Sequence, residues 1–204
     1  MEDTYLTTDH EDRSEIKVKG SRFIAESYLV GSVEEALAKL ESVRKREYAA
    51  THHCYAYVVG ITGAPQFKYS DDGEPSGTAG KPIYDVIVGR GLTNLLVVVT
   101  RYFGGTKLGT GGLAHAYSDA ARAVVEQSGV RTNYITRRFR CLLDFSHYDL
   151  WQRQLNHLQA NIVDSQFTDR VSLVVEIRLS RAEQLTTSFA EVTSGKGRLE
   201  EIGT

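Results

Sequence analysis

The chain has 204 residues, 41% of them hydrophobic and 25% charged, and its formal net charge at pH 7 is −2. These values are typical of a globular protein with one large or two small domains, and they exclude a globally basic nucleic-acid-binding chain. The two cysteines, Cys54 and Cys141, indicate free thiols rather than a disulfide scaffold. No apolar run reaches the ~20 residues that a bilayer span needs. The acidic N-terminus resembles neither a signal peptide nor a transit segment. We therefore expect a cytoplasmic protein without a membrane partner.

Periodicity predicts the elements of the first 130 residues. Runs of β-branched and aromatic residues predict strands over residues 13–19, 22–30, 53–61, 66–70 and 95–103. Apolar residues at helical spacing predict helices over residues 32–47 and 113–127, and Ser32 with Glu35 has capping-box spacing. The apolar segment 83–88 is expected to be helical, with a strand as the alternative. We expect residues 1–12, a polar leader, and residues 71–82, a loop rich in Gly and Pro, to be irregular.

The second part of the chain has a different order of elements. Strands are predicted over residues 139–145, 162–168, 171–179 and 198–202, and helices over residues 147–159 and 182–192. This order is βαββαβ, the split βαβ unit of ferredoxin-like domains. The boundary falls in the segment 129–136, so we expect one domain over residues 1–132 and a second over residues 133–204.

The most informative segment is Val97–Tyr117, in which a buried strand leads into a helix through a glycine-rich loop. The strand ends in Arg101, Tyr102 and Phe103. Five glycines follow, at positions 104, 105, 109, 111 and 112. Glycines let the backbone approach a partner closely, and a helix N-terminus directs unpaired N–H groups toward an anion. The segment therefore predicts an anion-facing surface, and a tight turn with no ligand is the alternative.

Other polar clusters give weaker signals for chemistry. His52 and Cys54 lie on one face of a strand, but the chain has no CxxC or HExxH motif, so we expect no metal. His53 and Cys54 point to opposite faces and cannot form a catalytic dyad. No GxSxG motif or Walker A loop occurs. We therefore name no catalytic residue and no cofactor.

Four motifs, taken together, carry a family resemblance. They are KGSRF at Lys19–Phe23, HHC at His52–Cys54, SDDGEPSGTAGKP at Ser70–Pro82, and RYFGG followed by LG within Arg101–Gly109. In this order they closely resemble the motifs of the IMPACT/YigZ family, also labelled UPF0029, and the match covers nearly all of residues 13–130. The βαββαβ part looks like the extra domain of the bacterial members.

The resemblance implies an α+β fold and a setting in translation. The first domain of such proteins is similar to ribosomal protein S5 domain 2, and the second is similar to the ferredoxin-like domain V of elongation factor G. Eukaryotic relatives regulate translation initiation. For bacterial members, similarity of fold suggests binding to RNA or the ribosome. This expectation rests on similarity of fold alone, and function is determined by sites rather than by folds.

We therefore predict a non-enzymatic factor that binds RNA or the ribosome, and a protein partner in translational control is a second expected contact. The predicted nucleic-acid or anion-binding residues are Lys19, Arg22, His52, Lys81, Arg101, Tyr102, Gly104, Gly105, Lys107, Gly109, Gly111 and Gly112. Aromatic side chains beside cations offer a stacking surface for bases. The acidic residues Asp71, Asp72 and Glu74 are expected to hold Arg22 or Arg101 in place, or to cap backbone N–H groups.

Three alternatives stay open at this point. The first is a small-molecule or phosphate-dependent enzyme with its site between loops 70–82 and 104–112. In its favour, Gly109–Ala114 resembles the glycine loop of the galactokinase and homoserine kinase superfamily. The second is a protein-docking surface beside Tyr102 and Phe103. The third is that the glycines and acids serve only the backbone geometry of the fold.

Overall fold

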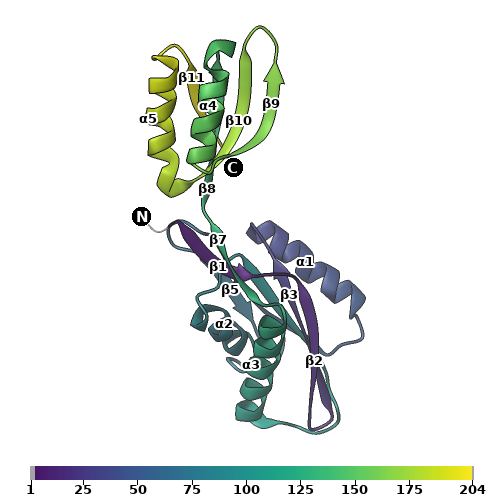
Figure 1. Ribbon diagram of the computed structural model, residues 1–204. Coiled ribbons are helices and arrows are strands. Elements are labelled where there is room, and N and C mark those ends of the chain that lie inside the picture. Colours follow the sequence, from purple (N-terminus) through teal and green to yellow (C-terminus); the bar gives the residue numbers. More distant parts are fainter. Residues whose placement is uncertain (1–2, 204) are drawn as a thin grey trace. The chain divides into compact units, whose positions relative to one another are not determined.

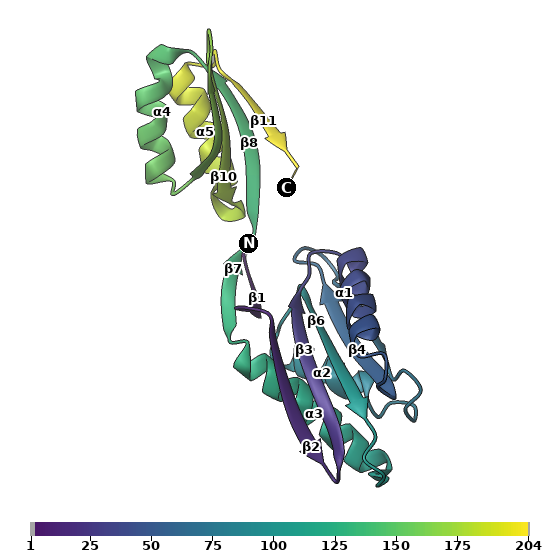
Figure 2. The same cartoon turned by 90° about the vertical axis from the view of Figure 1, so that its right-hand side faces the viewer.

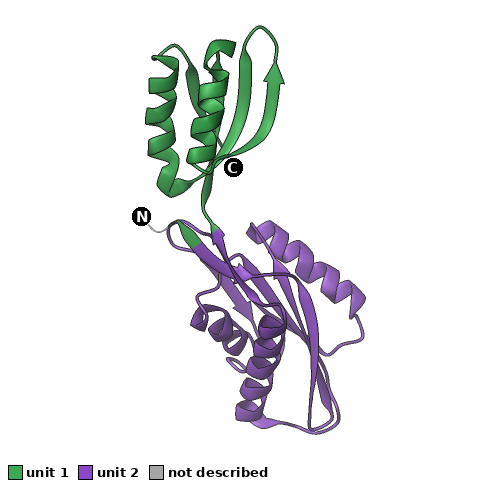
Figure 3. Ribbon diagram, in the orientation of Figure 1, with its two compact units in different colours: residues 1–4, 134–204 green, residues 5–133 purple. Residues whose placement is uncertain are grey.

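The computed structural model describes residues 3–203 and divides into two compact units (Figure 3). Residues 5–133 form the N-terminal unit, and residues 1–4 and 134–204 form the C-terminal unit. Each unit contains both helices and a sheet, so the predicted α+β class is confirmed. Among the described residues, no helix is long and apolar enough to cross a membrane.

The N-terminal unit is built on a five-stranded antiparallel sheet (Figure 1). Its strands, in spatial order, are β2 (Asp12–Val18), β3 (Ser21–Leu29), β6 (Leu95–Tyr102), β4 (His52–Val59) and β5 (Gln66–Ser70). The central strand β6 has the sequence LLVVVTRY and is buried over its first seven residues. A continuous apolar run of this kind is suited to a strand that is covered on both faces.

Helices cover both faces of this sheet (Figure 2). α2 (Gly80–Gly89) and α3 (Gly109–Gln127) pack on one face, and α1 (Val33–Arg46) packs on the other. Ser32 accepts a hydrogen bond from the Glu35 N–H at 3.2 Å, and the Glu35 carboxylate accepts one from Gly31 at 2.8 Å. The Ser32 half of the predicted capping box is therefore present and satisfies one N–H group of the helix start, whereas Glu35 accepts from the residue before the N-cap.

Two predictions about the N-terminal unit were wrong. Residues 3–12 are not a loose leader, because β1 (Thr4–Thr8) pairs with β7 (Val130–Tyr134) in a two-stranded sheet, while residues 1 and 2 lie outside the described residues. Both strands are short and polar, so neither has the alternation of apolar residues that marks a strand in sequence. The two helices α2 and α3 also begin earlier than expected, at Gly80 and Gly109 rather than at residues 83 and 113. The glycines at the start of α2 and α3, which suggested a loop, lie in the first turn of each helix. The N–H groups of a first turn have no i−4 carbonyl partner within the helix.

The C-terminal unit has the predicted βαββαβ order. Its elements are β8 (Thr136–Leu143), α4 (Phe145–His157), β9 (Asn161–Phe167), β10 (Val171–Arg178), α5 (Ala182–Thr193) and β11 (Arg198–Ile202), with a short 3₁₀ turn at Leu179–Arg181. The sheet order is β11-β8-β10-β9. Residues of β10 alternate between buried and half-buried, as expected for a strand with helices on one face only. The core of the unit includes Trp151 and Phe189, whose rings meet edge to face at 4.9 Å.

Candidate functional site

The motif segments of the N-terminal unit meet at one end of its sheet, which we call the loop end. It consists of the β2–β3 turn at Lys19 and Gly20, the loop 71–79 and the loop 103–108. A Cβ atom added to Gly104 would lie 2.0 Å from the carbonyl carbon of Gly20, so the two backbones touch and only glycine fits. The Gly104 N–H also donates a hydrogen bond to Ser21 Oγ at 3.1 Å. Lys19 is therefore held next to the glycine-rich loop.

Asp71 caps the N-terminus of α2. Its Oδ1 accepts hydrogen bonds from the N–H groups of Ala79 and Gly80 at 2.9 and 2.8 Å, and its Oδ2 accepts one from Gly77 at 2.8 Å. A carboxylate at this position satisfies free N–H groups and interacts favourably with the helix dipole. This is one of the two roles expected for the acidic residues. It also means that the α2 N-terminus is already occupied by a side chain.

Asp72 fastens the same loop to the sheet and to α1. Its Oδ2 accepts a hydrogen bond from the His53 N–H at 2.7 Å, and its Oδ1 accepts one from Arg44 at 3.1 Å. The ring nitrogen Nδ1 of His52 lies 2.7 Å from the Asp72 carbonyl oxygen. His52 is thus engaged with the loop, and its environment is that of a structural residue.

Glu74 and Arg101 form a buried ion pair behind the loop end. Arg101 Nη1 donates to Glu74 Oε1 at 2.6 Å, and their side chains are only 6% and 4% exposed. Tyr117 donates a hydrogen bond to the same carboxylate oxygen at 2.8 Å, and Arg101 Nη2 reaches Ser21 Oγ at 3.3 Å. The prediction that an acidic residue holds Arg101 is therefore confirmed for Glu74, whereas Arg22 has another partner.

Burial at this cluster also decides the state of two neighbouring groups. It raises the pKa of the Cys54 thiol and the pKa of the Tyr117 hydroxyl well above their ordinary values, because ionisation would place a charge in a poorly solvated interior. Both groups therefore stay protonated at neutral pH. Cys54 is a small core residue here rather than a nucleophile.

A pocket of about 350 Å³ opens between the two motif loops, next to the buried ion pair. Its lining residues are Glu74, Pro75, Arg101, Phe103, Lys107, Leu108, Gly109, Thr110 and Leu113. The first turn of α3 forms part of the wall and has no side-chain cap. Free space surrounds the Cβ positions of Gly109 and Gly111, so the start of the helix is accessible. A concave site that contains cations and free N–H groups is suited to an anion.

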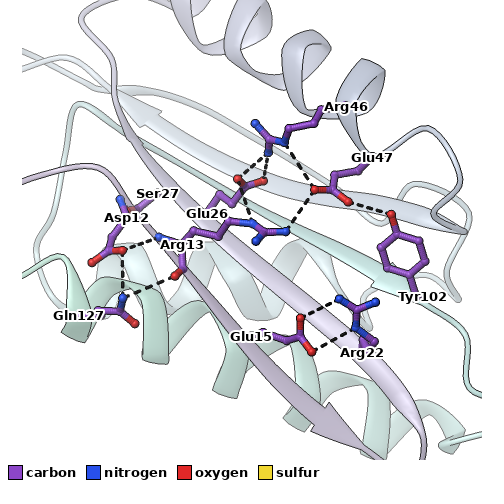
Figure 4. Close-up of polar contacts among 10 residues, drawn as sticks. All are labelled: Asp12, Arg13, Glu15, Arg22, Glu26, Ser27, Arg46, Glu47, Tyr102 and Gln127. Atoms are coloured by element: carbon purple, nitrogen blue, oxygen red, sulfur yellow. Dashed lines mark hydrogen bonds and ion pairs between the residues drawn. The ribbon is translucent and has the colours of Figure 1, made fainter.

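The predicted cations do not all face this pocket. Arg101 and Lys107 line it, and Lys19 lies next to the adjoining loop. Arg22 lies on the α1 face of the sheet, where it forms two hydrogen bonds with Glu15 (Figure 4). Lys81 is bound to Asp85 one turn further along α2. The structure thus places three of the predicted cations together and leaves two elsewhere.

A second polar cluster, which the sequence motifs did not predict, lies on the α1 face of the sheet (Figure 4). Glu26 is bound by Arg46 and lies 3.6 Å from Arg13, while Glu47 accepts hydrogen bonds from Arg13 and Tyr102. Burial raises the pKa of the Glu26 carboxyl despite these arginines. Burial also opposes ionisation of Glu47, but hydrogen bonds from Tyr102 and Arg46 hold its pKa below the usual value.

The residues of this cluster come from β2, β3, β6 and the end of α1. Only the pairing of the strands and the packing of α1 on the sheet bring them together. The one signal in sequence is the alternation of charged residues along β2, at Arg13, Glu15 and Lys17. Tyr102, predicted as a stacking residue, donates its hydroxyl hydrogen to Glu47 and has Arg22 beside its ring, 5.4 Å from the centroid. Within residues 3–203, no group of three His, Cys, Asp or Glu side chains is placed to hold a metal ion.

Fold and site together define a two-unit α+β protein in which two loop motifs surround a pocket lined by Glu74, Arg101 and Lys107. The model of the Impact N-terminal domain matches residues 19–125, and that of a domain of unknown function, DUF1949, matches residues 141–196. IMPACT family member YvyE of Bacillus subtilis is 32% identical over 198 residues, covering 97% of this chain and 91% of YvyE. The chain belongs to the IMPACT family.

Two further proteins extend the comparison. The protein IMPACT homolog of Saccharomyces cerevisiae is 30% identical over 109 residues, which cover 52% of this chain and 42% of the yeast protein. A crystal structure described as that of a hypothetical protein is 30% identical, with a TM-score of 0.72, and covers 100% of this chain and 99% of its own. The fold is therefore shared with a solved structure over the whole length of the chain.

Proposed function

We propose that this protein binds RNA, in the setting of translation, through the loop end of its N-terminal unit. The observation that carries the proposal is the position of Lys19 and Lys107, two exposed lysines on loops whose backbones are in contact. Among residues 3–203, neither lysine forms an ion pair, in contrast to Arg22 and Lys81. Exposed cations without internal partners are free to neutralise phosphates.

The surroundings of these lysines support the same proposal. Phe103 lies on the loop that carries Lys107, and half of its surface is exposed. An exposed ring beside cations is the arrangement on which unpaired bases stack in single-stranded RNA. Because the net charge is −2, attraction of a polyanion requires a local basic surface of this kind. Membership of the IMPACT family agrees with a role in translational regulation, which the family resemblance implies.

The test is binding to purified ribosomes and to single-stranded RNA at several salt concentrations. We expect saturable binding that weakens with salt, because phosphate contacts release counterions. The variant Lys19→Ala/Lys107→Ala removes two contacts and should flatten the plot of log K against log salt by about 1.4 for single-stranded RNA. The control Lys39→Ala/Lys68→Ala removes the same charge from α1 and β5 and should leave the slope unchanged. Equal effects of the two variants would reject the loop end as the interface.

A phosphate-dependent enzyme is the second candidate, and the pocket favours it because it joins loops 70–82 and 104–112. The groups nearest to it that are suited to acid–base chemistry are already engaged. Glu74 Oε1 is paired with Arg101, and His52 Nδ1 lies 2.7 Å from the Asp72 carbonyl oxygen. We therefore propose binding as the function of this site.

A further inference from the structure

The pocket at the loop end has two chemically different walls. One wall is positive, because it contains Lys107 and the uncapped first turn of α3. The other wall contains Glu74, whose Oε1 is used by Arg101 and Tyr117. Within residues 3–203, the other oxygen, Oε2, accepts no hydrogen bond. The lining therefore offers a ligand both hydrogen-bond donors and a carboxylate oxygen that accepts no hydrogen bond from the described residues.

Arg101 adds a second incompletely hydrogen-bonded side chain to the lining of the pocket, beside Glu74. Its side chain is more than nine-tenths buried and lines the pocket, yet its Nε–H has no hydrogen-bond partner among the described residues. Buried N–H groups of arginine are costly to leave unpaired. An uncapped helix start alone would not define a site, but here it shares a cavity with a buried ion pair that is incompletely hydrogen-bonded.

The size and rim of the pocket narrow the class of ligand. About 350 Å³ is at the small end of the ~300–1,000 Å³ that ligand sites occupy. Phe103 lines the pocket with half of its surface exposed, and the Arg101 guanidinium lies 5.5 Å from its ring centroid. Pro75, Leu108 and Leu113 supply apolar lining. A compact ligand with an anionic end, a hydroxyl group and a flat apolar part would use all of these features.

We propose that this pocket binds a mononucleotide unit. The phosphate contacts Lys107 and the N–H groups at the start of α3, a ribose hydroxyl donates to Glu74 Oε2, and the base stacks on Phe103. A free nucleoside monophosphate and the 5′-phosphorylated end of an RNA both carry this chemistry. The inference rests on the proposed function to the extent that both require phosphate binding at the loop end.

The test is calorimetric titration of the full chain with AMP, ribose 5-phosphate, adenosine and inorganic phosphate. We expect AMP to bind more tightly than ribose 5-phosphate, and both more tightly than phosphate or adenosine. Phe103→Ala should weaken the binding of AMP about tenfold and leave the affinity for ribose 5-phosphate nearly unchanged, since stacking is worth ~1–3 kcal/mol per base. Lys107→Ala should lower the affinity for both ligands, whereas Lys81→Ala should leave both affinities unchanged. Equal affinities for AMP and inorganic phosphate would overturn the proposal.

Two RNA oligonucleotides, identical except for a 5′-phosphate or a 5′-hydroxyl, distinguish the sources of the nucleotide. Tighter binding of the phosphorylated RNA, with competition by AMP, supports an RNA end in the pocket. AMP binding without a difference between the RNAs supports a free nucleotide. If both RNAs bind equally and AMP does not bind at millimolar concentration, the pocket proposal fails and the RNA proposal stands. If neither RNA nor AMP binds, both fail.

Discussion

Glu74 and Arg101 at the loop end are buried, whereas Glu15 and Arg22 on the sheet face have side chains that are 33% and 47% exposed. Both pairs have good geometry, but their surroundings make their contributions to the free energy of unfolding different. Removing one partner of a buried pair leaves a charge without compensation in a poorly solvated place. An exposed charge that loses its partner is simply hydrated by water. The motif arginine Arg101 is therefore a structural requirement of the site in addition to any contact with a ligand.

The variant Arg101→Met should lower the free energy of unfolding by about 3–5 kcal/mol, because Glu74 is left charged and buried. Arg22→Met should leave the free energy of unfolding almost unchanged. Urea denaturation followed by circular dichroism measures both effects. The double variant Glu74→Met/Arg101→Met should recover part of the loss, since it removes the orphaned charge as well. Similar losses for the two arginine variants would show that the buried pair is not an important source of stability.

The glycines of the segment 104–112 have different roles because they lie in different elements. Gly104 is in the loop after β6, where it touches the β2–β3 turn, and this contact aligns the two loops of the site. Gly109, Gly111 and Gly112 belong to the first turn of α3. Gly109 lines the pocket and has free space around its Cβ position, so the helix start is accessible there. One glycine-rich motif thus serves both the fold and access to the site.

Gly104→Ala should destabilise the N-terminal unit, because its Cβ would lie within 2.3 Å of the backbone of Gly20 and Ser21. We expect a loss of at least ~2 kcal/mol in the free energy of unfolding, typical of forced overpacking. Gly111→Ala has free space around its Cβ and lies in a helix, so it should be neutral or stabilising by up to ~1 kcal/mol. Urea denaturation of the two variants is the measurement. A tolerated Gly104→Ala would mean that the two loops are not in contact.

At the scale of the whole molecule, each unit has its own hydrophobic core. The C-terminal core surrounds Trp151, which is completely buried and is the single tryptophan of the chain. The N-terminal unit buries two clusters, one on each face of its sheet. A unit with its own core can unfold on its own transition. Tryptophan fluorescence therefore reports on one unit, while far-UV circular dichroism reports on both.

This division predicts that damage to one unit leaves the other intact. Arg101→Met should move part of the circular dichroism transition to lower urea and leave the fluorescence transition in place. Leu173→Ala, in the core of the C-terminal unit, should move the fluorescence transition, with a loss of ~2–5 kcal/mol in the free energy of unfolding. If Arg101→Met moves both signals equally, the two units unfold as one cooperative body.

The sequence by itself determined the elements whose signals are local. Period and propensity located the apolar strand β6, the capping box of α1 and the βαββαβ order of the C-terminal unit. The four motifs also determined the family. Signals of this kind survive without tertiary context because they depend on residues that are close in the chain. The short polar strands β1 and β7 have no such local signal, because each is formed by pairing with a segment at the opposite end of the N-terminal unit. They were therefore not predicted.

Only the tertiary structure decided how the motif residues are used. It paired Arg101 with Glu74, 27 positions away, and gave Arg22 of β3 to Glu15 of β2. It also brought Lys19 beside the loop of Lys107 through the contact of Gly20 with Gly104. Charged residues in one motif can face a ligand, a helix end or each other, and the composition is the same in every case. The choice depends on which strands pair and in what register, because register sets which side chains share a face.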